Sequence, residues 1–301
     1  MKSVSEILES VKKNEKKQRI VIANATLEEI MVVKQTEELN LANFTLIGDE
    51  SDIIDSLLAV GLDPKDMLLI HETNAKKCSE LAVQEVVEGR SDILMKGQVH
   101  TATFLGAVMQ SPKFFDKKSR LSQITLFDGL DHKLKLLSDC AINIQPDFAA
   151  KVDIINNAVG VAKKLGIQLP KVAILDAVEI VNPKMPSTLE AAALTQMNRR
   201  GQIKDCVIDG PLSFDNAVFV EFAELKDIDS EVAGQADILV THELREANNL
   251  SKAIIHYAQR PAASIIAGIK LPLVMTSRSD RKQNKLYTIA VQCYLATLQK
   301  G

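Results

Sequence analysis

The sequence predicts an α/β fold built on mainly parallel sheets that are covered by helices on both faces. Short β-branched runs alternate with helical patterns from one end of the chain to the other, which is typical of repeated β-α-β units. Most of these runs are apolar throughout, as expected for strands buried on both faces of a sheet. The chain has 301 residues, and at about 150 residues per domain this length indicates two domains.

Each apolar run is of strand length and is bounded by turn residues or by a helical pattern. Helical patterns fill most of the sequence between the runs, so we expect parallel strands joined by helices. In chain order, strands are expected at Arg19–Ala23, Phe44–Gly48, Met67–His71, Ile93–Lys96, Lys171–Leu175, Cys206–Asp209, Ile238–Thr241, Ser264–Gly268 and Leu273–Ser277.

One stretch breaks this alternation, because two strand-like runs follow one another without a helix between them. The runs Leu121–Phe127 and Lys133–Leu137 are joined across Asp128-Gly129, a favourable turn dipeptide. We therefore expect a β-hairpin here, near a domain boundary.

Glycines and one capping pattern mark the helix boundaries. Gly61, Gly89 and Gly166 each fall just past a helical apolar pattern, where a residue in the left-handed conformation commonly ends a helix. Ser187 and Glu190 have capping-box spacing and predict a helix start at Ser187.

The composition excludes several classes of protein. Hydrophobic side chains make up 46% of the chain and charged ones 25%, which rules out a disordered, collagen-like or coiled-coil protein. The 36 basic and 39 acidic residues give a net charge of −3. No basic excess is present to neutralise phosphates, so no nucleic-acid partner is expected.

We expect neither a membrane segment nor an export signal. No apolar run approaches the roughly 20 residues that cross a bilayer, and Met1–Arg19 lacks the apolar segment and cleavage site of a secretory signal. The expected location is therefore the cytoplasm, without a membrane partner. The four cysteines are widely spaced and form no Cys-x-x-Cys pair, so neither a disulfide framework nor structural zinc is expected.

In an open parallel sheet the ligand lies beyond the carboxyl ends of the strands, so the loops after the expected strands are the candidate site. One strand runs into Lys96-Gly97, then His100 and a helix start with Thr101 and Thr103. Free backbone N–H groups, the helix dipole and Lys96 could together hold an anion there. The alternative is a solvated lysine, a turn glycine and a threonine N-cap.

Two further loops present polar side chains. The loop at 181–190 contains two prolines that stiffen it around Asn182 and Lys184, and its alternative interpretation is a rigid connector. After another buried strand come two carboxylates, either of which could accept a proton. Ordinary turn and helix-start chemistry is the alternative for this group, which comprises Asp209, Gly210, Asp215 and Asn216.

The last expected strand ends in Thr-Ser-Arg. An arginine such as Arg278, beside Ser277, suits bidentate binding of phosphate or carboxylate, and a surface arginine next to a serine cap is the alternative. His242 and Glu243 follow another strand and suggest a metal ligand or a catalytic base. Without further ligands at metal spacing, a polar strand end is the alternative there.

The candidate loops lie in five sequence segments, which follow one another in the order seen in a known family. They are residues 92–104 (DILMKGQVHTATF), 177–192 (AVEIVNPKMPSTLEAA), 209–217 (DGPLSFDNA), 231–239 (EVAGQADIL) and 276–280 (TSRSD). Together they resemble the phosphate acetyl/butyryltransferase family, and within it the phosphate butyryltransferases. The first 90 residues contribute only a generic α/β pattern.

The resemblance implies a fold similar to the isocitrate/isopropylmalate dehydrogenases, with two α/β domains around an interdomain cleft, in a homodimer. It divides the chain into residues 1–138 plus 277–301 and residues 139–276. It also implies the reaction acyl-CoA + phosphate ⇌ acyl phosphate + CoA on a short or branched acyl group of the butyryl or isobutyryl type. Coenzyme A is then a substrate, and no bound cofactor, metal or protein-bound acyl intermediate is expected.

Roles for individual residues follow from the same resemblance. Ser277 and Arg278 would hold the phosphoryl group, and the loop from Lys96 to Thr103 would supply anion contacts and N–H groups for the developing oxyanion. The expected catalytic residues are Arg278, Ser277, Lys96, His100 and Asp280. The expected substrate-binding residues are Gly97, Thr101, Thr103, Asn182, Lys184, Asp209, Gly210, Asp215, Asn216, Glu243 and Asn248.

Several positions depart from the family pattern. Gly106 stands where relatives usually carry lysine or arginine, Ala247 replaces a glycine, and Ser251 replaces a tyrosine. Asn284 stands where the acetyltransferases have an aspartate as candidate thiol base, and Asp280 is the nearest carboxylate. These departures motivate an alternative function, a catalytically weakened protein that binds CoA or acyl phosphate. An NAD-dependent dehydrogenase of the same fold is a further alternative, although no G-x-G-x-x-G follows a strand.

Overall fold

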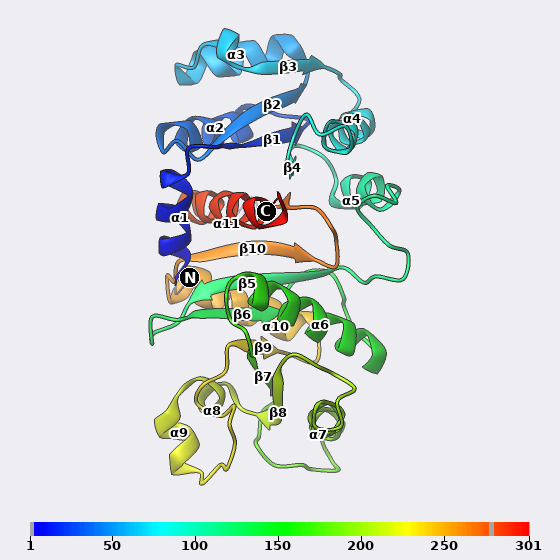
Figure 1. The fold of residues 1–301 in the computed structure, drawn as a ribbon, viewed down its shortest axis with the longest axis vertical. Helices are drawn as coiled ribbons and strands as arrows, with labels where there is room; N and C mark the ends of the chain where they lie inside the picture. The colour runs from blue at the N-terminus through cyan, green and yellow to red at the C-terminus, as the bar shows by residue number, and fades with distance from the viewer. Residues whose placement is uncertain (1–2, 277–279, 301) are drawn as a thin grey trace. The chain divides into compact units, whose positions relative to one another are not determined.

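The computed structural model describes residues 3–276 and 280–300, and the chain forms two compact units (Figure 1). The first unit comprises Val4–Ser119 with Ala263–Gly301, and the second comprises Arg120–Ala262. These breaks precede the boundaries expected at Ser138 and Ser277. The reason is that the predicted hairpin pairs within the second unit, whereas the last strand pairs within the first.

The first unit contains a five-stranded parallel sheet in the order β11-β4-β1-β2-β3. Because β1 has β2 on one side and β4 on the other, the chain reverses its direction across the sheet after β3. Open α/β sheets bind ligands at such a switch point, at the carboxyl ends of the strands. The strands are β1 (Gln18–Ala23), β2 (Ala42–Gly48), β3 (Leu68–His71), β4 (Ile93–Lys96) and β11 (Leu273–Val274).

Helices of the first unit cover this sheet with apolar side chains. Ile30 of α2, Leu57 of α3 and Ile289 of α11 join Ile20 and Ile22 of β1 in one core. The helices are α1 (Val4–Lys13), α2 (Leu27–Glu38), α3 (Glu50–Val60), α4 (Ala75–Val87), α5 (Thr101–Met109) and α11 (Lys282–Lys300). A 3₁₀ turn at Pro64–Asp66 precedes β3.

The second unit contains strands in the order β5-β6-β9-β7-β8. The β5–β6 pair is antiparallel, and the other neighbours are parallel. Here too a later strand, β9, is inserted between two earlier ones. The strands are β5 (Ser122–Asp128), β6 (Leu134–Ser138), β7 (Lys171–Leu175), β8 (Val207–Leu212) and β9 (Ile238–Val240), and β10 (Ala262–Ala267) begins at the last residue of the unit.

A separate core holds the second unit together, and it includes Leu137, Ala173, Leu239 and Ala247. Its helices are α6 (Phe148–Lys164), α7 (Pro186–Arg199), α8 (Phe214–Val218), α9 (Val220–Leu225) and α10 (Leu244–Lys252), followed by a π-helical turn at Ala253–Tyr257. In the part of the chain that the structure describes, no helix combines the length and the hydropathy that crossing a bilayer requires.

The structure confirms the expected strands and the β-hairpin, with shifts at their ends. The hairpin connection runs from Gly129 to Lys133, one residue later than expected, and Gly129 N–H donates to the Lys133 carbonyl at 2.8 Å. The left-handed residue of this connection is His132, at φ +59°. The three predicted helix-ending glycines all have positive φ, and Gly61 is the C-cap of α3.

Two predictions of local structure were wrong. α7 begins at Pro186 with Met185 as its N-cap, so Ser187 does not cap the helix; proline at the first helical position fixes the start by its restricted φ. β8 continues to Leu212, so Asp209 and Gly210 lie inside the strand instead of following it. The strand continues because Leu212 still pairs with Leu175 of β7 past an irregularity in the register.

Candidate functional site

The carboxyl ends of β1 and β4 meet at the switch point of the first unit. Gly97 N–H donates to the Ala23 carbonyl at 3.0 Å, and Gln98 N–H donates to the Asn24 carbonyl at 2.8 Å. The Asn24 side-chain amide returns a bond to the Gln98 carbonyl at 2.7 Å. The two loops are therefore held together at the edge where a parallel sheet binds ligands.

Gly97 is required by this close approach. A Cβ atom at Gly97 would lie 2.4 Å from the Asn24 carbonyl oxygen and 2.6 Å from that of Ala23. Both contacts are with backbone atoms, which cannot move aside as a flexible side chain could. Gly97 thus has a structural reason to be glycine, in addition to its expected place in the substrate site.

Lys96 is the last residue of β4, and its side chain folds back over the following loop. Its Nζ donates to the carbonyls of Gly97 and Val99, each at 3.1 Å. The ammonium group thus lies beside the loop that was expected to bind an anion, and it also fixes the path of that loop.

α5 begins directly after this loop, with its N-terminal turn at the same edge. His100 is the N-cap and is exposed, and its side chain makes no capping hydrogen bond. Thr101 and Thr103 occupy the first turn, which contains no acidic residue. The first N–H groups of a helix lack intrahelical partners and favour anions, and here they lie at the same edge as Lys96 and Gly97.

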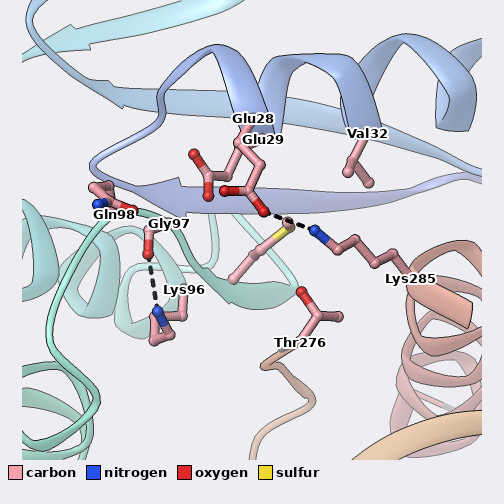
Figure 2. A pocket seen from close by; sticks show the side chains of 9 residues that line it. Glu28, Glu29, Val32, Lys96, Gly97, Gln98, Thr276 and Lys285 are labelled. Carbon is pink, nitrogen blue, oxygen red and sulfur yellow. Dashed lines mark hydrogen bonds and ion pairs between the residues drawn. The ribbon is translucent and has the colours of Figure 1, made fainter. Parts of the chain in front are cut away.

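A pocket opens at this edge between α2, the end of β4 and α11 (Figure 2). Its lining brings together residues from distant parts of the first unit: Glu28, Glu29, Val32, Met95, Lys96, Gly97, Gln98, Thr276 and Lys285. Lys285 Nζ lies 2.8 Å from Glu28 Oε1. Neither residue of this pair was singled out by the sequence patterns. They are 257 positions apart, and only the placement of α2 and α11 on one sheet reveals the pair.

Ser277 and Arg278, the expected phosphoryl ligands, lie outside the described residues. β11 ends at Val274, and Thr276 lines the pocket just before them. Asp280, which lies within the described residues, is half-buried and precedes the start of α11 at Lys282. Asn284 is buried in the first turn of that helix.

In the second unit, the carboxyl ends of four strands are followed by polar residues. Asp139, which follows β6, accepts hydrogen bonds from the backbone N–H groups of Gln123, Ala141, Ile142 and Asn143 at 3.0–3.1 Å. These four bonds tie the segment after β6 to the backbone at Gln123 in β5. Asp139 therefore organises the loop after β6, a role that the sequence patterns did not suggest.

His242 follows β9 and lies in a buried charged cluster. Its Nε2 is 3.4 Å from Asp176 Oδ2, and its Nδ1 is 3.4 Å from Glu190 Oε2 and 3.5 Å from Lys151 Nζ. Lys151 also forms an ion pair with Glu190. The side chains of Lys151, Asp176 and His242 are 7%, 6% and 8% exposed. The histidine thus faces Asp176 of the loop after β7 and Glu190 of α7, not its neighbour Glu243.

Asn182 and Lys184 lie on the loop that precedes α7. Asn182 Oδ1 accepts from the Lys184 backbone N–H at 3.0 Å, and Asn182 N–H donates to Thr188 Oγ1 at 2.9 Å. The Lys184 side chain is exposed. The loop is rigid, as both interpretations of its prolines require.

The residues from Asp209 to Asn216 are mostly engaged in internal contacts. Asp209 Oδ1 accepts from Gly210 N–H at 2.9 Å, and a Cβ at Gly210 would lie 2.8 Å from Ile174 Cβ. Asp215 accepts a hydrogen bond from the Ser213 hydroxyl, which lowers the pKa of Asp215. Asn216 is fully buried, and its side-chain amide donates to Glu179 at 3.3 Å.

Glu243 and Asn248 are likewise bound within the second unit. Glu243 is the N-cap of α10 in a capping box with Glu246. The Asn248 side-chain amide donates to the Cys140 carbonyl at 2.9 Å. We therefore assign both a part in positioning the loops at this edge.

The departures at Ala247 and Ser251 are internal to the fold. Ala247 is fully buried in the core, and Ser251 Oγ lies 2.8 Å from Thr125 Oγ1 in a buried contact. These two replacements therefore alter packing inside the unit. Gly106 differs, since it lies in α5 with open space where a Cβ would be.

The cysteines are poor nucleophiles in this environment. All four are buried and free. Burial raises the pKa of Cys140 and of Cys293 to about 12 and that of Cys206 to about 11. Thiols with raised pKa values are rarely ionised and react slowly. Over residues 3–276 and 280–300, the structure contains no group of three or more His, Cys, Asp or Glu side chains that could hold a metal ion.

Comparisons of the sequence and of the structure with known proteins point to the same family. Residues 67–293 match the family model described as "Phosphate acetyl/butaryl transferase". The phosphate butyryltransferase of Clostridium acetobutylicum is 38% identical over 98% of this chain and 99% of its own length. The probable phosphate butyryltransferase of Bacillus subtilis is 40% identical over 92% of each chain. A branched-chain phosphotransacylase of Enterococcus faecalis superposes with a TM-score of 0.83 at 30% identity, over 93% of this chain and 99% of that one.

Proposed function

The chain belongs to the phosphate acetyl/butyryl transferase family, and from this premise we propose that it interconverts a short or branched-chain acyl-CoA and phosphate with acyl phosphate and CoA. It is an acyltransferase that acts with phosphate. The butyryl or isobutyryl type of acyl group is supported by relatives that carry the butyryltransferase and branched-chain phosphotransacylase names. We also propose that it works in the cytoplasm as a homodimer, with CoA as a substrate and no bound cofactor.

The observation that carries the proposal is the edge of the first unit at the end of β4. There Gly97 brings two loops together, Lys96 contributes an ammonium group and α5 presents its N-terminal turn. Thr101, Thr103 and His100 lie at the start of this helix. An acyl phosphate has anionic oxygens that suit such donors, and its carbonyl develops negative charge that the same N–H groups can stabilise.

In the proposed mechanism the CoA thiolate attacks the acyl phosphate carbonyl directly. Phosphate leaves, and no acyl group is transferred to the protein. The buried cysteines with raised pKa values support this order of events, because none is suited to act as the nucleophile. Holding both substrates in one site supplies much of the rate enhancement.

The remaining expected residues have proposed roles that follow from their contacts. Ser277 and Arg278 are proposed to bind the phosphoryl group, with Asp280 close to them in sequence. Asn182 and Lys184 are proposed as substrate contacts from the second unit, because their loop is rigid and Lys184 is exposed. The other expected substrate residues of the second unit are proposed to position the loops at the carboxyl ends of its strands. They are Asp209, Gly210, Asp215, Asn216, Glu243 and Asn248.

The test is CoA release from acetyl-, butyryl-, isobutyryl- and isovaleryl-CoA, measured with a thiol reagent in the presence and absence of phosphate. Phosphate-dependent release is expected, and the ranking of the four esters identifies the acyl preference. Tight CoA binding without any release would overturn the proposal in favour of a binding protein.

A further inference from the structure

The proposed reaction requires the sulfur of CoA to lose a proton before it attacks. A free alkyl thiol such as that of cysteine has a pKa of about 8.5, so most of it is protonated near neutral pH. A nearby group with a lower pKa is needed to accept the proton as the thiolate forms. A carboxylate in the pocket at the end of β4 would suit this role.

Two carboxylates line that pocket, and they differ in what they are bound to (Figure 2). Glu29 Oε2 accepts from both the backbone N–H and the hydroxyl of Thr26, at 3.0 and 2.7 Å. These bonds complete the capping box at the start of α2. Glu29 is therefore committed to the fold of the helix.

Glu28 lies beside Glu29 but turns its carboxylate to Lys285. The distance between Lys285 Nζ and Glu28 Oε1 is 2.8 Å, and the two side chains are 11% and 40% exposed. The contact with this mostly buried ammonium group fixes the direction of the Glu28 carboxylate oxygens. The exposure of Glu28 leaves it accessible to a substrate in the pocket.

We propose that Glu28 is the proton acceptor for the CoA sulfur, with Lys285 as the residue that positions it. This inference rests on the proposed phosphate acyltransferase function. The S–H bond breaks as its proton moves to a Glu28 carboxylate oxygen, and the sulfur electron pair forms the new C–S bond. The C–O bond to phosphate breaks, phosphate departs with that electron pair, and Glu28 returns the proton to it. In the opposite direction Glu28 protonates the departing thiolate.

The experiment measures kcat for acyl phosphate plus CoA between pH 6.5 and 9 in the wild type and in Glu28→Gln. Loss of a general base typically lowers a rate by about 10²–10⁴-fold, and that loss is expected at pH 7. Because hydroxide can ionise the thiol without the base, the wild-type/variant rate ratio should shrink about tenfold per pH unit up to about pH 8.5. A merely structural role for Glu28 would not produce this recovery.

The matched control is Glu38→Gln, an exposed carboxylate at the other end of α2, which should keep the wild-type rate. A rate ratio for Glu28→Gln near one, or one that is constant across this pH range, would overturn the inference. A wild type without phosphate-dependent CoA release would overturn the proposed function instead.

A second pair of variants tests the inference should Glu28→Gln fail to fold. Lys285→Met should lower kcat while keeping the wild-type pH profile, because the carboxylate remains but is no longer held. Lys285→Arg should restore most of the rate, and Lys282→Met, an exposed lysine on the same helix, should change nothing. An unchanged kcat in Lys285→Met would contradict the assigned roles.

Discussion

At the scale of single residues, the glycines of the candidate site differ in what their missing side chain allows. Gly97 lets the loop after β4 touch the backbone at the end of β1. Gly106, nine positions later in α5, has nothing within 4 Å of a Cβ position. Glycine is thus required at position 97 by the close approach of two backbone segments, whereas no steric contact requires glycine at position 106.

Replacing Gly97 by alanine is therefore expected to damage both stability and activity. The new Cβ would overlap two carbonyl oxygens, and overpacking of this kind costs about 1–3 kcal/mol of unfolding free energy. Displacing the loop should also lower the acyltransferase rate. Urea unfolding and the CoA-release assay measure the two effects.

Gly106→Ala is the matched control for that prediction. Alanine in the interior of a helix is more stable than glycine by about 0.5–1 kcal/mol, and open space at Gly106 permits it. This variant should unfold at higher urea concentration than the wild type and keep its activity. Equal stability of the two alanine variants would contradict the assigned contacts of Gly97.

At the scale of elements, the second unit depends on charged contacts between the ends of its strands and helices. α6, α7 and the loops after β7 and β9 meet in the cluster of Lys151, Glu190, Asp176 and His242. α8 begins with the bond between Ser213 and Asp215. The cluster holds both ends of the loop that carries Asn182 and Lys184, because Asp176 precedes this loop and Glu190 follows it in α7.

Lys151→Met is expected to destabilise the protein. It removes the cation that faces Glu190 and the buried Asp176–His242 pair. Breaking a buried ion pair costs about 3–5 kcal/mol, and since Glu190 is partly exposed we expect about 2–3 kcal/mol in urea unfolding. Lys163→Met is the control on the same helix, because Lys163 pairs with Asp205 at an exposed site and should lose less than about 1 kcal/mol. Similar losses of unfolding free energy in both variants would contradict this account of the cluster.

The Ser213–Asp215 bond predicts a pH dependence of stability. The hydroxyl of Ser213 lowers the pKa of Asp215 in the folded protein. A carboxyl with a lowered folded-state pKa contributes stability above its unfolded pKa and loses it as the pH falls through the folded value. Ser213→Ala should thus be less stable than the wild type at pH 7, and the difference should vanish on acidification below pH 4. A difference in unfolding free energy that stays constant down to pH 2 would argue against this coupling.

At the scale of the whole molecule, the two units differ in how the chain builds them. The second unit is one continuous segment with its own core. The first unit needs both ends of the chain, because β11 pairs with β4 and residues of α11 belong to the core around β1. The active-site proposals for Lys96, Glu28 and Lys285 therefore require the last part of the chain to be present.

A fragment comprising residues 120–267 is expected to fold on its own, because this continuous segment carries the core of the second unit and every strand from β5 to β10. It should show a native-like far-UV circular dichroism spectrum and cooperative urea unfolding. A fragment of residues 139–276, which follows the boundaries expected from the sequence, would lack β5 and β6 and leave β9 unpaired on one side. It should aggregate, and cooperative folding of this second fragment alone would refute the observed division.

Much of the fold was predictable because local patterns dictate it. Apolar runs such as Ile93–Lys96 and Lys171–Leu175 appear in the structure with the bounds expected, since burial on both faces leaves a continuous apolar signature. Gly97 was predicted to lie in the loop after β4. The close approach of this loop to the backbone at the end of β1 explains why the residue is glycine. The capping pattern at Ser187 misled because the neighbouring Pro186 sets the helix start.

The sequence by itself determined the α/β class, the strands and the loops that carry the family segments. Only the tertiary structure decided which of those loops meet: Glu28 with Lys285, and His242 with Asp176 and Glu190. The physical reason is that strand order in a sheet is set by packing of the whole chain. Residues far apart in sequence become neighbours when β4 is placed beside β1, or β9 beside β7, and no local pattern records that choice.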